Sequence, residues 1–294
     1  MATTPANARY AGMRQPGKSR GLLEVFTQGH LLKLLVRKDV QIRYRGSVMG
    51  WAWSYVKPLS QFLVYYLILG HVLKFGQSIP NYAIYMFSGL MFVNMFNEAL
   101  GNATKSIIAN GSLVKKVYLP REMFPLSSVL IAFVNFLPQL AIIVVISLFF
   151  GWRPSVTDLS ALILAIVITM VMALGLGLFF GAINVGLRDA QALVDVILMF
   201  TFWLSPVVYQ VSAIENAFPH WLFQLYELNP ITAAVRLSHF AIWAPTVSDS
   251  GSVTAAMGTG VFRYGLLSLA IALAMVLIGQ LVFRKLEKNF AQDI

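Results

Sequence analysis

Residues 105–125, KSIIANGSLVKKVYLPREMFP, lie between two long apolar runs and determine how the rest of the chain is interpreted. The stretch holds one acid, Glu122, against four cations, Lys105, Lys115, Lys116 and Arg121. A polar loop between apolar spans that is this rich in Lys and Arg lies on the cytoplasmic side of a membrane. The sequence therefore predicts a membrane protein with a basic cytoplasmic loop.

The same loop contains the pattern of a short helix. Leu113, Val114 and Val117 recur at helical spacing, and Pro120 disfavours helical backbone at the residue before it. We expect an amphipathic helix on the membrane surface, with an apolar face that nothing else in this chain covers. Such a face predicts docking on a cytoplasmic partner that moves the loop. The candidate coupling residues are Leu113, Val114, Lys115, Lys116, Val117 and Tyr118.

The composition is that of a protein with several membrane spans. Hydrophobic residues make up 58% of the 294 and charged residues 12%, against roughly 25% charged in soluble domains. The net charge of +10 does not indicate a nucleic-acid partner, because the cations cluster beside apolar runs, where they anchor to anionic lipid headgroups. The sequence has no cysteine, which excludes disulfides, thiolate metal sites and cysteine nucleophiles.

Six apolar segments are each close to the roughly 20 residues that a helix needs to cross the hydrocarbon core. We place these spans at 52–74, 82–104, 126–150, 159–185, 192–211 and 261–283. An even number of spans puts both termini on one side. Only four of the 22 Lys and Arg residues fall on the opposite side, namely Lys74, Arg153, Arg236 and Arg263. The sequence thus predicts an all-α membrane protein with six transmembrane helices and both termini in the cytoplasm.

Residues 1–20 are polar and basic, and we expect them to form a disordered cytoplasmic tail. They contain GMRQPGKS at residues 12–19, which satisfies the phosphate-loop pattern G-x-x-x-x-G-K-[ST]. That loop requires a buried strand before it and a helix after it, and neither is predicted here. We interpret the match as a coincidence.

Residues 21–45 have the pattern of an amphipathic helix that lies on the membrane. The apolar side chains Leu32, Leu35, Val36 and Val40 share one face, and polar residues occupy another. A solvated helix with scattered charges is the alternative. The candidate cations of this helix are Lys33, Arg37, Lys38, Arg43 and Arg45.

The segment between the last two spans is too short to cross the membrane twice. Residues 213–243 are about half apolar and are interrupted at Pro230, which Asn229 precedes as a helix-capping residue. We expect two short re-entrant helices that return to the outer side. An ordinary extracellular loop is the alternative.

Aromatic residues suggest a path for a sugar chain, because aromatic faces stack on sugars while forming few fixed hydrogen bonds. The candidate lining residues are Tyr65, Tyr66, Phe92, Phe96, Glu98, Phe202, Trp203 and Tyr209. Glu98 shares a helix face with Asn94 and either belongs to a polar stripe along a pore or is a structural carboxylate. Gly177 and Gly181 form a G-x-x-x-G motif that allows close helix contact.

Several segments resemble the ABC-2 type permeases that export polysaccharides. They are RKDVQIRYRGSVMGW at 37–51, KP at 57–58, VKKVYLPREMFP at 114–125, SPVVY at 205–209 and LNP at 228–230, and they follow the order of that family over almost the whole chain. The end of the WSYVKP stretch at 53–58 departs from the expected LNP and is closer to actinobacterial relatives, which favours galactan as the cargo.

The resemblance implies that transport and ATP hydrolysis belong to different subunits. Residues 46–294 would form a six-span permease domain that dimerises with a second copy and pairs with two separate ATP-binding subunits. Residues 21–45 would be its interface helix, and Leu113 to Tyr118 its coupling helix. This chain would hold no cofactor, because ATP and magnesium would bind the partner subunits. The cargo would be a polysaccharide on a polyprenyl-pyrophosphate lipid, of the O-antigen, teichoic acid or galactan type, exported across the bacterial cytoplasmic membrane.

Two other functions are weaker alternatives. An ion-coupled flippase of lipid-linked glycans should show buried ionisable relays, for which only Glu98 qualifies. A membrane glycosyltransferase should show paired carboxylates or a metal motif near an interface, and the sequence shows neither.

Overall fold

The computed structural model describes residues 21–44, 52–116, 119–247 and 250–290. Over these ranges the chain is helical and contains no strand, so the predicted all-α fold class is confirmed. The predicted disordered tail at 1–20 lies outside the described residues, as do Arg45, Val117 and Tyr118.

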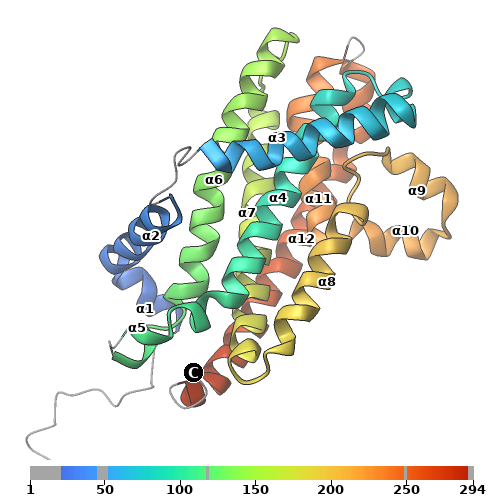
Figure 1. Ribbon diagram of the computed structural model, residues 1–294. Helices are drawn as coiled ribbons and strands as arrows, with labels where there is room; N and C mark the ends of the chain where they lie inside the picture. Colours follow the sequence, from blue (N-terminus) through green and yellow to red (C-terminus); the bar gives the residue numbers. More distant parts are fainter. Residues whose placement is uncertain (1–20, 45–51, 117–118, 248–249, 291–294) are drawn as a thin grey trace, which may run out of the picture.

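The helices follow one another with short connections (Figure 1). In the first half of the chain they are α1 Leu22–Thr27, α2 Gly29–Tyr44, α3 Trp53–Tyr65, η3 Tyr66–Val72, η4 Phe75–Gln77, α4 Tyr82–Ala109, α5 Gly111–Lys116 and α6 Met123–Phe149. In the second half they are α7 Val156–Gly186, α8 Asp189–Trp203, α9 Val211–Ala217, α10 His220–Glu227, α11 Pro230–Ser238, η5 His239–Trp243, η6 Ala244–Thr246, α12 Ser250–Leu286 and η7 Glu287–Asn289.

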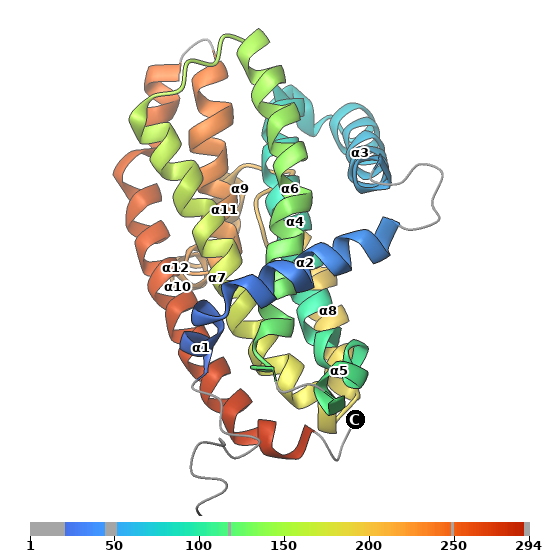
Figure 2. The same ribbon diagram turned by 90° about the vertical axis from the view of Figure 1, so that its left-hand side faces the viewer.

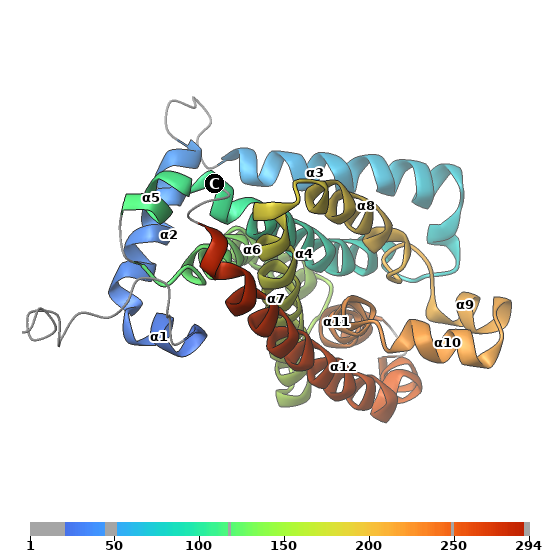
Figure 3. The same ribbon diagram turned by 90° about the horizontal axis from the view of Figure 1, so that it is seen from below.

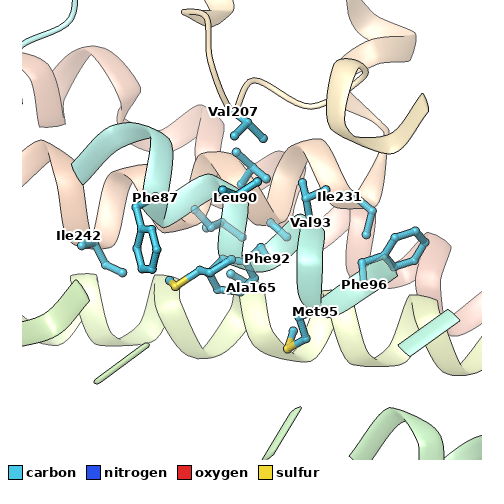
Figure 4. Close-up of a cluster of buried hydrophobic side chains, with 14 of the residues drawn as sticks. Phe87, Leu90, Phe92, Val93, Met95, Phe96, Ala165, Val207, Ile231 and Ile242 are labelled. Carbon is cyan, nitrogen blue, oxygen red and sulfur yellow. The ribbon is translucent and has the colours of Figure 1, made fainter. Parts of the chain in front are cut away.

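The main core surrounds α4. Most of α4 between Tyr82 and Leu100 is buried against α6, α7, α8 and α11, while Asn94, Asn97 and Glu98 on one face are half-buried. Figure 4 shows part of this core, in which Phe92 and Leu90 of α4 lie among Ala165 of α7 and Ile231 of α11. Because protein rather than lipid surrounds α4, this helix tolerates asparagines and a carboxylate that a lipid-facing helix would not.

Three helices of the described part are long and apolar enough to cross a membrane: α6, α7 and residues Gly260–Asn289 at the end of α12. These helices carry exposed apolar side chains such as Leu148, Ile163 and Leu277, as expected of a surface that faces lipid. The predicted spans 126–150, 159–185 and 261–283 coincide with them. The full six-span topology stays a prediction.

The predicted first and fifth spans differ from simple crossing helices. Residues 53–72 are helical, but α3 has only 13 residues before the π-helical η3, and it runs across α6 and α4 rather than along them (Figures 1 and 2). The fifth span was predicted at 192–211, whereas α8 ends at Trp203 after 15 residues. Neither helix alone has the roughly 20 residues that a perpendicular crossing requires.

Glycines bring α7 close to two neighbours. A Cβ on Gly279 of α12 would lie 2.3 Å from the main-chain oxygen of Gly175, and a Cβ on Gly177 would lie 2.6 Å from Cβ of Ala103 on α4. Gly181 also faces Ala103, so the G-x-x-x-G motif does provide close helix contact. That contact is made within the chain, between α7 and α4.

The segment 213–243 forms two structurally different parts. Helices α9 and α10 project sideways at mid-height of the bundle, whereas α11 and η5 are buried inside it (Figure 1). Asn229 caps α11 as predicted, because its Oδ1 accepts a hydrogen bond of 3.1 Å from the backbone N–H of Ile231. An exposed surface loop over the whole segment is therefore excluded, because residues 230–244 are almost entirely buried.

Candidate functional site

The basic loop forms the predicted short helix at one end of the bundle. This helix, α5, lies near α2 and the end of the described chain (Figures 1 and 3). Its bounds are Gly111–Lys116, so it contains Leu113, Val114, Lys115 and Lys116 of the predicted coupling residues.

The apolar face of α5 is covered by the chain itself, contrary to our expectation for this loop. Val114 is 8% exposed and belongs to a buried cluster with Ile107 of α4 and Phe124 of α6, and Leu113 packs partly against the same cluster. The expectation of an uncovered apolar face is therefore wrong for Val114. The physical reason is that the ends of α4, α6, α7 and α12 converge here and bury it. The outer surface of α5 is formed by Ser112 and Lys115, which are exposed.

The helix α2 lies across the bundle beside α6 (Figure 2). Leu35 is buried, while Leu32, Val36 and Val40 are half-buried, so the predicted apolar face is directed towards the protein. Lys33 and Arg37 are exposed. Arg43 lies in the last turn of α2, and its side chain is outside the described part.

A polar contact joins α2 to the basic loop. Lys38 Nζ donates a hydrogen bond of 3.0 Å to Asn110 Oδ1, at the junction of α4 and α5, and lies 3.2 Å from Asp39 Oδ1. The two predicted cytoplasmic elements therefore form one surface. Its exposed cations are Lys33, Arg37, Lys105 and Lys115. Such a surface can bind an acidic protein face or the anionic headgroups of a lipid.

Three of the predicted conduit residues belong to the buried core: Phe202 of α8, and the pair Phe92 and Phe96 of α4. Phe92 is fully buried against Phe136 of α6, with ring centroids 5.1 Å apart in an edge-to-face arrangement, and Phe96 is 3% exposed. Neither can line an open path in this conformation. The prediction is wrong for this pair because α4 is surrounded by protein rather than placed at the edge of the bundle.

The other aromatic candidates gather where α3, η3 and α8 meet. The Tyr65 and Phe202 rings lie 4.8 Å apart, and Trp203 is 56% exposed beside Phe202. Tyr209 donates a hydrogen bond of 2.8 Å to the main-chain oxygen of Trp203. Tyr66 stacks more loosely between Phe62 and Tyr82. The lining role of Tyr65, Tyr66, Trp203 and Tyr209 stays a prediction, whereas Phe202 is only 6% exposed and belongs to the core.

Glu98 has a partner within the chain. Its Oε1 accepts a hydrogen bond of 2.7 Å from Asn135 Nδ2 on α6. A carboxylate between two packed helices is stabilised by such a donor. This contact is what the structural alternative for Glu98 predicts, and the neighbouring Asn94 is half-buried on the same helix.

A polar cluster between α10, α11 and α12 has no counterpart among the local sequence patterns. Arg236 of α11 forms an ion pair with Glu227 of α10, in which both side chains are largely buried, and Tyr264 of α12 lies close to Glu227. Nearby, the Tyr226 hydroxyl lies 3.3 Å from the Tyr209 hydroxyl, and burial raises the pKa of Tyr226 above its ordinary value. Sequence spacing could not reveal this cluster, because its members come from three helices.

Groups of three or more His, Cys, Asp or Glu residues that could hold a metal ion are absent from the described residues. Two of the histidines illustrate this, because they lie in different parts of the molecule and contact other kinds of residue. His239 stacks on Tyr85 at 3.8 Å within the core, whereas His220 is exposed on α10 and contacts Gln224.

Comparison with known proteins identifies relatives over nearly the whole chain. The profile of the family described as "ABC-2 type transporter" matches residues 30–243. The chain is 29% identical to the O-antigen export system permease protein RfbA of Klebsiella pneumoniae, with 91% of this chain and 97% of that protein covered. It is 26% identical to RfbA of Myxococcus xanthus, covering 92% and 98%. It is 21% identical to the polysialic acid transport protein KpsM of Escherichia coli, covering 76% and 84%.

Proposed function

The chain belongs to the ABC-2 type transporter family, and we propose that it is the membrane permease of a polysaccharide exporter driven by a separate ATP-binding subunit. The observation that carries this proposal is the similarity to O-antigen export permeases over 91% or more of the chain, which includes the basic loop and both flanking helices. The second group of relatives is named for transport of a capsule-type polysaccharide.

The structure supports an energy source outside this chain. The surface made by α2 and α5 presents exposed cations on two rigid helices that are joined by Lys38 and Asn110. A surface of this kind suits docking on a protein that changes shape, because both helices are packed onto the spans behind them. In this proposal two ATP-binding subunits hold ATP and magnesium, and α5 is the element that they push.

We also place a second copy of the chain beside the first. Figure 3 shows α3 and α8 on the same flank of the bundle, opposite α12. Both helices expose large apolar side chains, among them Leu63 and Leu67 near α3 and Met199 and Trp203 on α8. An exposed apolar flank of this extent can pack against another copy or against lipid. A conduit between two copies would then run past Tyr65 and Trp203.

The cargo that we propose is a polysaccharide carried on a polyprenyl pyrophosphate. The names of the relatives favour O-antigen-like and capsule-like chains, and the residues at 53–58 favour galactan. The membrane is the bacterial cytoplasmic membrane, with both termini in the cytoplasm, because the exposed cations of α2 and α5 lie at one end of the bundle.

The test is reconstitution of export in liposomes. The chain is inserted with and without its proposed ATP-binding subunit, and arrival of a labelled lipid-linked polysaccharide on the far side is measured after ATP addition. We expect export only when both the subunit and ATP are present, and no ATP hydrolysis by this chain alone.

Export without the subunit and without nucleotide would contradict the proposal. Dependence on a proton gradient instead of ATP would favour the ion-coupled flippase, for which Glu98 is the candidate carboxylate.

A further inference from the structure

Two consecutive residues of the basic loop contact the inner end of α12, which is far away in sequence. Gln280 Nε2 donates a hydrogen bond of 2.9 Å to Glu122 Oε1, and Glu122 is fully buried. Arg121 donates from Nη1 to the main-chain oxygen of Glu287, and its guanidinium carbon lies 5.7 Å from the centre of the Phe290 ring. We refer to Arg121, Glu122, Gln280, Glu287 and Phe290 as the α12 clamp.

An apolar cluster reinforces the clamp. Phe283 and Phe290 are both buried and meet edge to face with ring centroids 5.3 Å apart. They share a buried cluster with Val114 of α5 and with Met123 at the start of α6. Close-packed clusters of this kind move as a unit, because separating their side chains would open a cavity. The basic loop and the end of α12 are therefore one packed body.

The N-terminal amphipathic segment reaches the same place. A Cβ on Gly21, just before α1, would lie 2.8 Å from Gln280 Nε2. Gly21 has a positive φ of 77°, a conformation that glycine adopts without strain, and this allows the chain to turn closely against α12. Both cytoplasmic elements thus meet α12 at Gln280.

One face of α12 packs closely against α7, while many of its other side chains are exposed. Gly279, the neighbour of Gln280, touches the backbone of Gly175 on α7. Near the other end, a Cβ on Gly265 would lie 3.0 Å from Leu237 of α11, and Tyr264 lies close to Glu227 of α10. A displacement of the inner end of α12 therefore acts on its contacts with α7, α11 and α10.

From these contacts we infer that Glu122 and Arg121 are positioning residues that carry the displacement of the basic loop into α12. The inference rests on the proposed function, in which a partner pushes α5. In sequence the loop joins α4 to α6, and through Asn110 it also contacts α2. With the clamp, α12 also follows the loop, and this helix leads to the buried α10 and α11 contacts. Export then requires an intact contact between Glu122 and Gln280.

The first test exchanges the two partners of the buried hydrogen bond. Gln280→Glu places two carboxylates side by side and removes the donor. We expect ATP-driven export in liposomes to fall by about tenfold, while the ATP-binding subunit still co-purifies and still hydrolyses ATP. The double variant Glu122→Gln, Gln280→Glu restores a donor and an acceptor in exchanged places. We expect it to recover most of the export.

A matched control exists on α8. Gln191 Nε2 donates a hydrogen bond of 2.8 Å to Asp195 Oδ1, and the carboxylate of this Gln–acid pair belongs to an exposed residue, while Gln191 is half-buried. Gln191→Glu makes the same chemical change beside a carboxylate, at a place where water screens the repulsion. We expect wild-type export from Gln191→Glu. A loss of export that is equal in the control and in Gln280→Glu would overturn the inference.

A second variant addresses failure to fold. Gln280→Met has a similar volume and length but no donor, so it removes the hydrogen bond without adding a charge. We expect it to accumulate and to show ATP hydrolysis without matching export. Two results would overturn the inference. One is wild-type export from Gln280→Met. The other is loss of binding of the ATP-binding subunit in both Gln280→Met and the double variant. The wild-type complex is measured in parallel, and failure of that complex to export with ATP would instead contradict the proposed function.

Discussion

Glu98 Oε1 and Asn135 Nδ2 lie 2.7 Å apart and join the middle of α4 to the middle of α6 by a hydrogen bond. Asn135 is buried, and α4 and α6 form one of the most extensive helix contacts of the molecule. A polar contact at this depth is favourable only when both partners are present, because water is not available to replace either one.

We predict that Glu98→Gln retains export within about twofold, because an amide oxygen can still accept the hydrogen bond from Asn135. Glu98→Leu leaves the Asn135 amide without that acceptor and should lower the free energy of unfolding by about 1 to 3 kcal/mol. Thermal unfolding in detergent and export in liposomes measure the two effects. Complete loss of export by Glu98→Gln, with normal accumulation of the protein, would support proton coupling instead.

The close contact between α7 and α12 predicts the effect of a single methyl group. Gly279→Ala would place Cβ 2.3 Å from the main-chain oxygen of Gly175, so the two helices must separate. We expect a loss of about 1 to 3 kcal/mol in the free energy of unfolding, as for other overpacked contacts. Gly260→Ala on the same helix has no atom within 4 Å of its new Cβ and is the control. Equal thermal midpoints for the two variants would contradict the observed packing.

The two residue types of α5 should respond differently to added charge. Val114→Asp places a carboxylate in the buried cluster with Phe124 and should reduce accumulation of folded protein, at a cost of several kcal/mol. Lys115→Glu changes an exposed side chain, so the fold should persist while the ATP-binding subunit binds more weakly. Co-purification of that subunit at matched protein levels measures this effect.

The control for Lys115→Glu is Arg153→Glu, an exposed charge reversal in the connection between α6 and α7, at the other end of the bundle. Because Arg153 is remote from α2 and α5, we expect unchanged co-purification. If Lys115→Glu co-purified as well as this control, docking through the exposed face of α5 would be wrong.

The buried ion pair between Arg236 and Glu227 should matter most when only one partner is removed. Arg236→Met leaves Glu227 without its cation in a largely buried place, and we expect a loss of about 3 to 5 kcal/mol in stability. The double variant with Glu227→Leu removes both charges and should recover part of this loss. Unfolding midpoints of the two single variants and the double variant give the coupling free energy. Strictly additive losses would show that the pair does not interact.

Local sequence patterns determined the class of the protein and many of its element boundaries. The long apolar runs predicted α6, α7 and the end of α12 to within a few residues, because an apolar stretch of this length has to be helical in a membrane. Asn229 and Pro230 predicted the start of α11, since capping depends only on neighbouring residues. The basic loop and its short helix were likewise local features.

Tertiary structure alone decided which side chains are buried and which are exposed. Phe92 and Val114 were assigned to a conduit and to a docking face, yet both are buried, because helices distant in sequence surround them. The contact of Glu122 with Gln280 could not be predicted, since their proximity depends on how α12 returns to the basic loop. Periodicity shows which residues share a face of a helix, whereas only packing between helices shows what that face meets.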